Sequence, residues 1–374
     1  MNAASGMKLY LVAGEASGDA RGAELMRALR ERDANFEFMG AGGREMRALA
    51  DGDFLDWADE AVVGLWDVLK KYGYFKAQFD RMLAHIEHVA PAAVILIDYP
   101  GFNLRLAKAL RIRRFAGKII YYISPQVWAW NRGRIPQMAR VLDLMLCIFP
   151  FEQPLYEQSG LKTEFVGHPM IESLAAEKTG VARDSKLVGL FPGSREKEVA
   201  KILPVMMTTA KLLRARDQSL KFEAAAASPE LETLMRSITQ RDNFITITLR
   251  DAHGLMQRAA AGMVASGTAT LEAAYFGMPM TILYKTAWLT WAVGKRLVRV
   301  EFLGMPNILA GREVAREFLQ EAAVPEAIAA EITRLLTDET ARTTAQRELA
   351  AVVARLGEPG AAGRAADALC QALR

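Results

Sequence analysis

Short, continuously apolar segments recur along this chain. In the first half they cover residues 9–13, 36–39, 94–97, 119–123 and 144–149. In the second half they cover residues 187–191, 222–226, 245–249, 262–265 and 280–283. Runs this short that are apolar at every position are typical of strands buried on both faces of a parallel sheet.

Amphipathic segments separate these apolar runs and predict helices. In the first half the predicted helices cover residues 20–30, 75–89 and 104–115, the last with Asn103 as its N-cap. In the second half they cover residues 199–214, 231–240, 268–276 and 327–337. Strands that alternate with helices predict an α/β fold with parallel sheets covered on both faces.

The alternation is interrupted once, at Gly167-His168-Pro169 and the polar stretch 172–185 that follows. We place a domain hinge there. The predicted organisation is an N-terminal domain over 1–170, a second domain over 171–345 and an alanine-rich helical tail over 346–374. Each domain is expected to be Rossmann-like, with the two facing across a cleft and the C-terminal helices packing back.

Composition narrows the class of protein. Of the 374 residues, 51% are hydrophobic and 24% are charged, which fits a folded globular chain rather than a disordered one. The two cysteines, Cys147 and Cys370, lie in apolar runs and are expected to be reduced, as in the cytoplasm. The four histidines do not combine with cysteine at metal-ligand spacing, so no metal site and no cofactor is predicted.

Charge leaves one question open, whereas hydropathy does not. No signal peptide and no uncharged stretch long enough to span a bilayer is visible. The net charge is only +4, but residues 105–118 hold six cations and no acid. This stretch is either a solvated helix face or a surface for an anionic partner.

Two small-residue turns follow apolar runs at matching places in the two halves. The first is Gly14-Glu15-Ala16-Ser17-Gly18-Asp19, and the second is Ser266-Gly267-Thr268. A strand that ends in such a turn before a helix directs backbone N–H groups at a ligand, and this arrangement binds phosphate. Neither turn has the dinucleotide-binding G-x-G-x-x-G spacing, and no P-loop or G-x-S-x-G motif occurs. These absences favour a nucleotide-sugar enzyme over a dehydrogenase or a hydrolase.

Three residues near strand ends are candidates for binding a nucleotide. Glu272 is placed to reach ribose hydroxyls from the helix after Ser266, although an ordinary surface glutamate is the alternative. Ser194 and Arg195 follow another strand end and are placed to neutralise a leaving diphosphate, although a plain strand-to-helix turn is the alternative.

Asp98 is the candidate general base. It ends the apolar run 94–97, and ligands of parallel sheets lie beyond the carboxyl ends of strands. With Asn103 as the helix cap, Asp98 is left without an obvious local role, although turn hydrogen bonding is the alternative. Gln126, in the segment 124–130, offers an amide beside two tryptophans that core packing explains nearly as well.

Two stretches combine large apolar side chains with cations, at residues 62–75 and 288–299. Interfacial segments bury such side chains among lipid headgroups, while cations meet anionic lipid. The predicted membrane-contact residues are Leu65, Trp66, Leu69, Phe75, Trp288 and Trp291. Burial in the core is the alternative for both stretches.

Taken together, these motifs resemble those of the lipid-A-disaccharide synthase family, whose members are glycosyltransferases of the GT-B fold. The resemblance covers nearly the whole chain from Met7. It rests on the segments 12–19, 40–46, 97–103, 124–130, 167–168, 192–195, 266–272 and 306–313.

The resemblance implies transfer of diacylglucosamine from UDP-2,3-diacylglucosamine to 2,3-diacylglucosamine 1-phosphate. It implies inversion, no need for a metal, and release of UDP. It also implies roles for residues of this sequence. Asp98 and Arg195 would be catalytic. The donor would contact Ser194, Arg195, Ser266, Gly267, Thr268, Glu272, Asn307 and Arg312, and the acceptor Glu15, Ser17, Gly18, Asp19 and Gln126.

The expected setting is the bacterial cytoplasm, with peripheral attachment to the inner membrane. No nucleic acid is expected as a partner, and whether the chain forms a homodimer is left open. Two alternatives also stay open: another GT-B enzyme, such as a UDP-GlcNAc-type transferase or 2-epimerase, and a non-catalytic nucleotide-sugar or lipid-binding protein.

Overall fold

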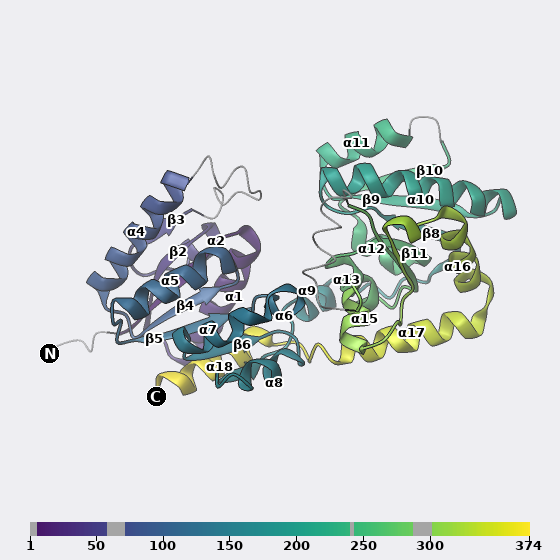
Figure 1. Ribbon diagram of the computed structural model, residues 1–374. Coiled ribbons are helices and arrows are strands. Elements are labelled where there is room, and N and C mark those ends of the chain that lie inside the picture. The colour runs from purple at the N-terminus through teal and green to yellow at the C-terminus, as the bar shows by residue number, and fades with distance from the viewer. Residues whose placement is uncertain (1–5, 58–71, 240–242, 287–300) are drawn as a thin grey trace. The chain divides into compact units, whose positions relative to one another are not determined.

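The chain forms two compact units (Figure 1). The computed structural model describes residues 6–57, 72–239, 243–286 and 301–374. One unit runs from the N-terminus to Glu172 and also includes Leu356–Arg374, and the other is Ser173–Arg355. The tail predicted as a separate segment is therefore divided between the units. Its helix α17 (Glu339–Ala354) belongs to the second unit, and α18 (Ala361–Leu373) packs on α1 (Ala16–Arg32) of the first.

The described strands of the first unit form a parallel sheet in the order β3-β2-β1-β4-β5-β6-β7. The strands are β1 (Met7–Ala13), β2 (Phe36–Gly42), β3 (Phe54–Asp56), β4 (Ala93–Ile97), β5 (Lys118–Tyr122), β6 (Leu144–Cys147) and β7 (Thr163–Phe165). The apolar pattern predicted all of these except β3 and β7. Those two are three-residue edge strands, too short for a hydrophobic run to mark them.

Helices cover both faces of this sheet. Residues of β1 alternate between two cores: Leu9 and Leu11 pack with α1 and α18, while Tyr10 and Val12 pack with α4 and α5. The remaining helices of this unit are α2 (Arg44–Arg47), α4 (Tyr72–Val89), α5 (Pro100–Ile112), α6 (Val127–Trp130), α7 (Ile135–Val141), α8 (Glu152–Glu157), the 3₁₀ turn Arg132–Arg134, and α9 (Met170–Ala176), which crosses the unit boundary.

The second unit repeats the same topology, with a parallel sheet in the order β10-β9-β8-β11-β12-β13 among its described strands. The strands are β8 (Asp184–Phe191), β9 (Lys221–Ala226), β10 (Ile245–Leu249), β11 (Ala259–Ala265), β12 (Met280–Tyr284) and β13 (Glu317–Leu319). The helices are α10 (Glu196–Arg216), α11 (Pro229–Thr239), α12 (Ala252–Arg258), α13 (Ala269–Tyr275), α15 (Met305–Ala310), α16 (Pro325–Thr337), α17 and the 3₁₀ turn Gln320–Ala322.

Both sheets have the doubly wound strand order, which reverses direction beside the first strand of each unit. The reversal falls between β1 and β4 in the first unit and between β8 and β11 in the second. Ligands of such sheets bind in the crevice outside the carboxyl ends of the strands at this point. The strand order therefore predicts that ligands bind near Gly14 and Asp98 in one unit, and near Gly193 and Ser266 in the other.

The predicted start and N-cap of α5 were wrong. Helix α5 begins at Pro100, not at 104, and its N-cap is Tyr99 rather than Asn103. Proline suits the first helical position because its missing N–H would have no partner there. Asn103 lies buried inside the helix, where its side-chain amide nitrogen Nδ2 donates to the backbone carbonyls of Ile97 and Asp98.

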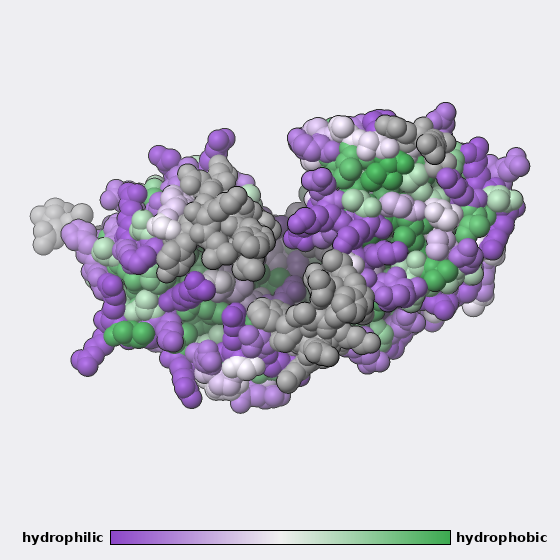
Figure 2. All heavy atoms as spheres, turned by 45° about the horizontal axis from the view of Figure 1, so that its top comes forward, coloured by the Kyte–Doolittle hydropathy of each residue, from purple (hydrophilic) through white to green (hydrophobic). Residues whose placement is uncertain are grey.

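The described surface is mostly polar on the face shown in Figure 2. Its exposed large hydrophobic side chains are scattered along the chain, at Met7, Ile112, Val181, Leu249 and Val324. Isolated exposures of this kind are ordinary. In the part of the chain that the structure describes, no helix is both long and apolar enough to cross a bilayer.

Candidate functional site

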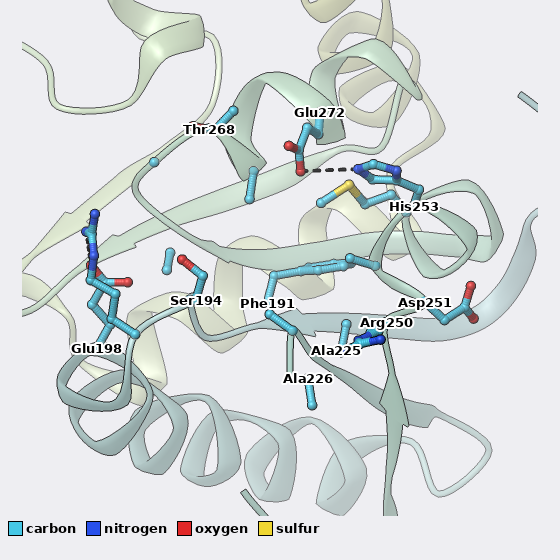
Figure 3. Close-up of a pocket in the computed structure, with 18 of the residues that line it drawn as sticks. Phe191, Ser194, Glu198, Ala225, Ala226, Arg250, Asp251, His253, Thr268 and Glu272 are labelled. Atoms are coloured by element: carbon cyan, nitrogen blue, oxygen red, sulfur yellow. Dashed lines mark hydrogen bonds and ion pairs between the residues drawn. The ribbon is translucent and has the colours of Figure 1, made fainter. Parts of the chain in front are cut away.

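A pocket of about 560 Å³ opens at the reversal point of the second unit. It lies at the carboxyl ends of β8, β9 and β11, and turns that follow β8, β10 and β11 line it (Figure 3). The candidate residues that line it are Ser194, Arg195, Ser266, Gly267, Thr268 and Glu272. Six residues chosen from separate sequence motifs therefore share one cavity.

The turn after β8 needs glycine at one position. Gly193 has φ +117°, and a Cβ built there would lie 2.7 Å from a carboxylate oxygen of Glu198. Arg195 follows as the N-cap of α10, and its guanidinium pairs with Glu198 at 3.0 Å. The Arg195 side chain is 69% exposed, so this weak surface pair leaves it able to turn toward an anion.

The turn after β11 is held by its first residue. The Ser266 amide donates to the Leu283 carbonyl, and its hydroxyl donates to the Leu303 carbonyl. Thr268 is the N-cap of α13, and the Thr270 and Leu271 amides already donate to the carbonyls of Gly267 and Thr268. Among the described residues, no backbone carbonyl accepts from the amides of Gly267, Thr268 and Ala269. Ser266 therefore fixes the turn, and the amides that follow it are the groups available to a ligand.

Sequence reasoning missed His253, which lies between two carboxylates at the pocket wall. Its Nδ1 is 2.6 Å from Glu177 Oε2, and its Nε2 is 3.4 Å from Glu272 Oε2 (Figure 3). Hydrogen bonding to Glu272 and to Glu177 raises the pKa of His253 to about 9, against the opposing effect of burial. The imidazole is therefore a cation at neutral pH. Neither Glu177 nor Glu272 is close to His253 in the sequence. The residues around His253, such as Asp251, therefore predict only a turn.

Ion pairs of Arg258 stabilise the turn after β10, which leads into the helix that carries His253. Arg258 pairs with Asp251 at 2.8 Å and with Glu223 of β9 at 2.8 Å. Arg250, which also lines the pocket, has φ +55°, a conformation uncommon for a non-glycine residue. The Arg258 pairs thus hold a strained turn in place beside His253.

Asn307 and Arg312 do not line this pocket. Asn307 is fully buried; its amide group donates to Ala315 and Glu317, and its carbonyl accepts from the amides of Val314 and Ala315. Its polar atoms are already committed to holding the turn after α15. Arg312 pairs with Glu348 on α17. The structure brings neither residue to the pocket lining, and their donor-binding roles stay predictions.

In the first unit, Asp98 lies at the end of β4 with its main chain firmly held. Its amide donates to Tyr122, and its carbonyl accepts from Asn103 and from the Tyr121 hydroxyl. Asp98 and Tyr99 have φ of +46° and +47°, so two successive non-glycine residues are left-handed. Strain held by surrounding hydrogen bonds is a property of functional turns.

Burial is the largest influence on the Asp98 carboxyl. Burial raises its pKa above the ordinary value, a Tyr99 backbone hydrogen bond opposes this, and the charge of Glu15 adds to the rise. The ring of Tyr99 lies against Gly14, where a Cβ would come within 2.2 Å of it. Gly14 therefore allows Tyr99, and with it Asp98, to approach the turn that carries Glu15.

The other predicted acceptor residues differ in exposure and role. Ser17 and Gln126 are exposed, and Gly18 packs against Ala13. Asp19 is buried, and its carboxylate accepts hydrogen bonds from the amides of Gly43, Glu45 and Met46. This carboxylate caps α2, and its acceptor-binding role stays a prediction.

A second buried carboxyl in this unit also escaped the sequence reasoning. Glu152, at the start of α8, accepts from Trp128 Nε1 at 2.8 Å and from the Phe149 amide at 3.1 Å. Burial raises its pKa to about 7, although these hydrogen bonds act against the rise. Glu152 thereby fixes the short helix that follows Gln126.

Within the described residues, no three histidine, cysteine or acidic side chains come together as metal ligands do.

Comparison with known proteins identifies the family. The family model described as lipid-A-disaccharide synthetase matches residues 9–368. The lipid-A-disaccharide synthase of Trichlorobacter lovleyi is 44% identical, over 96% of this chain and 96% of that protein. That of Geobacter sulfurreducens is 39% identical, over 98% and 97%. The chain belongs to the lipid-A-disaccharide synthase family.

Solved structures agree on the fold. UDP-GlcNAc 2-epimerase from Neisseria meningitidis, bound to UDP-GlcNAc, has a TM-score of 0.60 at 12% identity, covering 98% of this chain and 99% of that one. The calicheamicin glycosyltransferase CalG4 has a TM-score of 0.59 at 13% identity, covering 98% of each chain. At these identities the likeness shows the fold alone, which is of the GT-B type with two Rossmann-like domains.

Membership of the lipid-A-disaccharide synthase family makes this chain a UDP-sugar glycosyltransferase of lipid A biosynthesis. Its substrates are a UDP-sugar and a lipid-linked sugar. The motifs on which the sequence resemblance rested lie within the matched residues.

Proposed function

We propose that this enzyme transfers diacylglucosamine from UDP-2,3-diacylglucosamine to the 6-hydroxyl of 2,3-diacylglucosamine 1-phosphate, with inversion and without a metal. The products are the β-1,6-linked disaccharide 1-phosphate and UDP. The observation that carries the proposal is the pocket of the second unit, where Ser194, the turn after β11 and Glu272 come together.

The donor is proposed to bind in this pocket through its UDP group. Backbone N–H groups at the start of α13 and the Ser194 hydroxyl would donate to the diphosphate, and Arg195 would turn from Glu198 to neutralise it. Glu272 would accept from the ribose hydroxyls. The His253 cation, 3.4 Å from one Glu272 oxygen, orients that carboxylate and leaves its other oxygen to the ribose.

The acceptor is proposed to bind to the first unit, with Asp98 as general base. Inversion requires in-line attack by the acceptor hydroxyl on the face of the sugar opposite UDP. Asp98 would take the hydroxyl proton as the new bond forms, which for a general base contributes about 10²–10⁴-fold. A carboxylate with a raised pKa is a stronger base, and the hydrogen bonds to its main chain limit its movement.

The growing charge on the UDP oxygen would be stabilised by groups already in place. The amides before α13 do not reorient during the reaction, and Arg195 supplies a full positive charge. Alignment of the reacting atoms of the two substrates and exclusion of water would limit hydrolysis of the donor.

Peripheral attachment to the cytoplasmic face of the inner membrane is part of the proposal, because both substrates carry acyl chains. Five of the predicted contact residues lie outside the described residues: Leu65, Trp66, Leu69, Trp288 and Trp291. Phe75 is described and half-buried, with its ring edge-on to Trp57 at 6.3 Å. Phe75 is therefore partly committed to the core, and its membrane contact stays a prediction.

The test is a product analysis. The purified enzyme is mixed with both substrates in detergent, with a chelator present, and the products are identified by mass spectrometry. The disaccharide 1-phosphate and an equal amount of UDP are expected. Epimerised donor, or UDP released without disaccharide, would contradict the proposal, and an Asp98→Asn sample controls for contaminating activity.

A further inference from the structure

A second cavity, in the first unit, is lined by cations. It measures about 500 Å³ and lies between α5 and α7, which pack against each other. Its lining residues are Pro100, Gly101, Leu104, Arg105, Lys108, Arg134, Gln137, Met138, Arg140 and Val141, and none of them is acidic. Four cationic side chains and no carboxylate are among the residues that line this α5–α7 groove.

The structure separates the cations of the basic stretch 105–118. Arg111 and Arg113 are paired, with Asp143 and Glu87 respectively. Arg105 and Lys108, together with Arg140 from α7, have no acidic side chain within ion-pair distance among the described residues. Three like charges around one hollow repel each other, so an anionic ligand would relieve that repulsion.

The floor of the groove is apolar. Leu104 and Val141 are half-buried, and Met138 is buried. A cationic rim over an apolar floor matches an amphiphile that joins an anionic group to hydrocarbon better than it matches a free inorganic ion. A hollow of this volume also suits one headgroup, whereas a flat bilayer surface gives no reason for a cavity.

The position of the groove connects it with Asp98. Pro100 and Gly101, at one end of the groove, follow Asp98 and Tyr99 directly and form the N-terminus of α5. Positions 101, 104, 105 and 108 share one face of that helix. Arg105 and Lys108 lie about 7.5 and 12 Å along the helix axis from Pro100, at 1.5 Å per residue. The cations therefore begin within one sugar-sized step of the proposed base.

We infer that the α5–α7 groove binds the phosphate group of the lipid-linked acceptor. The inference rests on the proposed function, because it assigns the acceptor hydroxyl to Asp98 and the acceptor phosphate, at the far end of the sugar, to Arg105, Lys108 and Arg140. The dipole of α5 adds favourable potential at the near end of the groove.

The test compares two acceptors, 2,3-diacylglucosamine with and without its 1-phosphate, in an Arg105→Gln/Lys108→Gln variant. Both side chains are exposed, so the variant should fold. We expect kcat/KM for the phosphorylated acceptor to fall at least about 10-fold, as for lost charge-assisted hydrogen bonds, and kcat/KM for the unphosphorylated acceptor to stay unchanged. Lys118→Gln is the matched control and should behave as wild type. Lys118 is an exposed lysine at the N-terminal end of β5 and does not line the groove.

Three results overturn the inference: equal losses for both acceptors, no loss for either, or an unchanged acceptor preference with lost flotation on phosphatidylglycerol-containing vesicles. The last result would assign the groove to the bilayer. A calorimetric titration with glucosamine 1-phosphate separates this inference from the proposed function. If the wild type makes no disaccharide but binds this probe, and the double variant does not, the proposed reaction fails and the phosphate site stands. If neither protein binds the probe and acceptor preference is unaltered, the phosphate site fails.

Discussion

The two units have the same strand order, yet the crevices at their reversal points carry different chemistry. In the first unit, the end of β4 presents Asp98, an acid whose pKa is raised by burial and by Glu15. In the second, the ends of β8 and β11 present small-residue turns, and a histidine cation lies between two carboxylates. The shared topology sets where ligands bind, while the few residues after each strand decide which ligand and which role.

Asp98→Asn should have the largest effect, because it removes the base from one crevice and leaves the other intact. We expect kcat to fall at least about 10²-fold with UDP affinity unchanged. Turnover and calorimetric UDP titration of the same sample measure the two halves. Near-normal turnover would reject Asp98 as the base, and a parallel loss of UDP affinity would reject the division of labour between the units.

Glu272→Ala tests the other crevice. Loss of a charged hydrogen-bond partner should weaken UDP binding by about 1.5–3 kcal/mol, or roughly tenfold to a hundredfold. Glu326→Ala is the control, because Glu326 is an exposed carboxylate at the start of α16 and does not line the pocket. If calorimetry shows the two variants to be equally impaired, the nucleotide does not lie where the pocket predicts.

His253→Gln should change how stability depends on pH. The folded-state pKa of His253 is raised from 6.5 to about 9, so its ion pairs stabilise the native state fully below about pH 6.5. That contribution is lost as pH rises through about 9. Chemical denaturation of wild type and variant should therefore show a stability difference that shrinks over this range. A constant difference from pH 6 to pH 10 would mean that His253 is not a cation in the native state.

Glu15→Gln should have the smallest effect, confined to the first crevice. Removing the negative charge should lower the pKa of Asp98, so the acid limb of the kcat/KM profile should move to lower pH. Activity is lost as pH falls through the Asp98 pKa, because only the carboxylate accepts a proton. A limb that moves upward, or does not move, would show that Glu15 does not act on Asp98.

Much of the fold was readable from hydropathy, since buried parallel strands form nearly continuous apolar runs. Edge strands such as β3 (Phe54–Asp56) were not, and neither was the start of α5, where proline and a left-handed Tyr99 outweigh the capping preference of Asn103. Asp19 shows a second limit. An acid beside a phosphate-binding turn suggests a ligand, but its carboxylate is used by three backbone amides from a segment 24 to 27 positions away.

The sequence by itself determined the alternation of strands and helices, the two small-residue turns and the family, because each depends on neighbouring residues or on motifs in order. Only the tertiary structure decided which polar residues remain available to a ligand. The polar atoms of Asn307 hold the turn after α15, and His253 lies between Glu177 and Glu272. Among the cations of 105–118, Arg111 and Arg113 form ion pairs with described residues, whereas Arg105 and Lys108 do not. The physical reason is that burial and pairing depend on side chains distant in sequence, and these decide whether a charge is satisfied within the fold or left for a substrate.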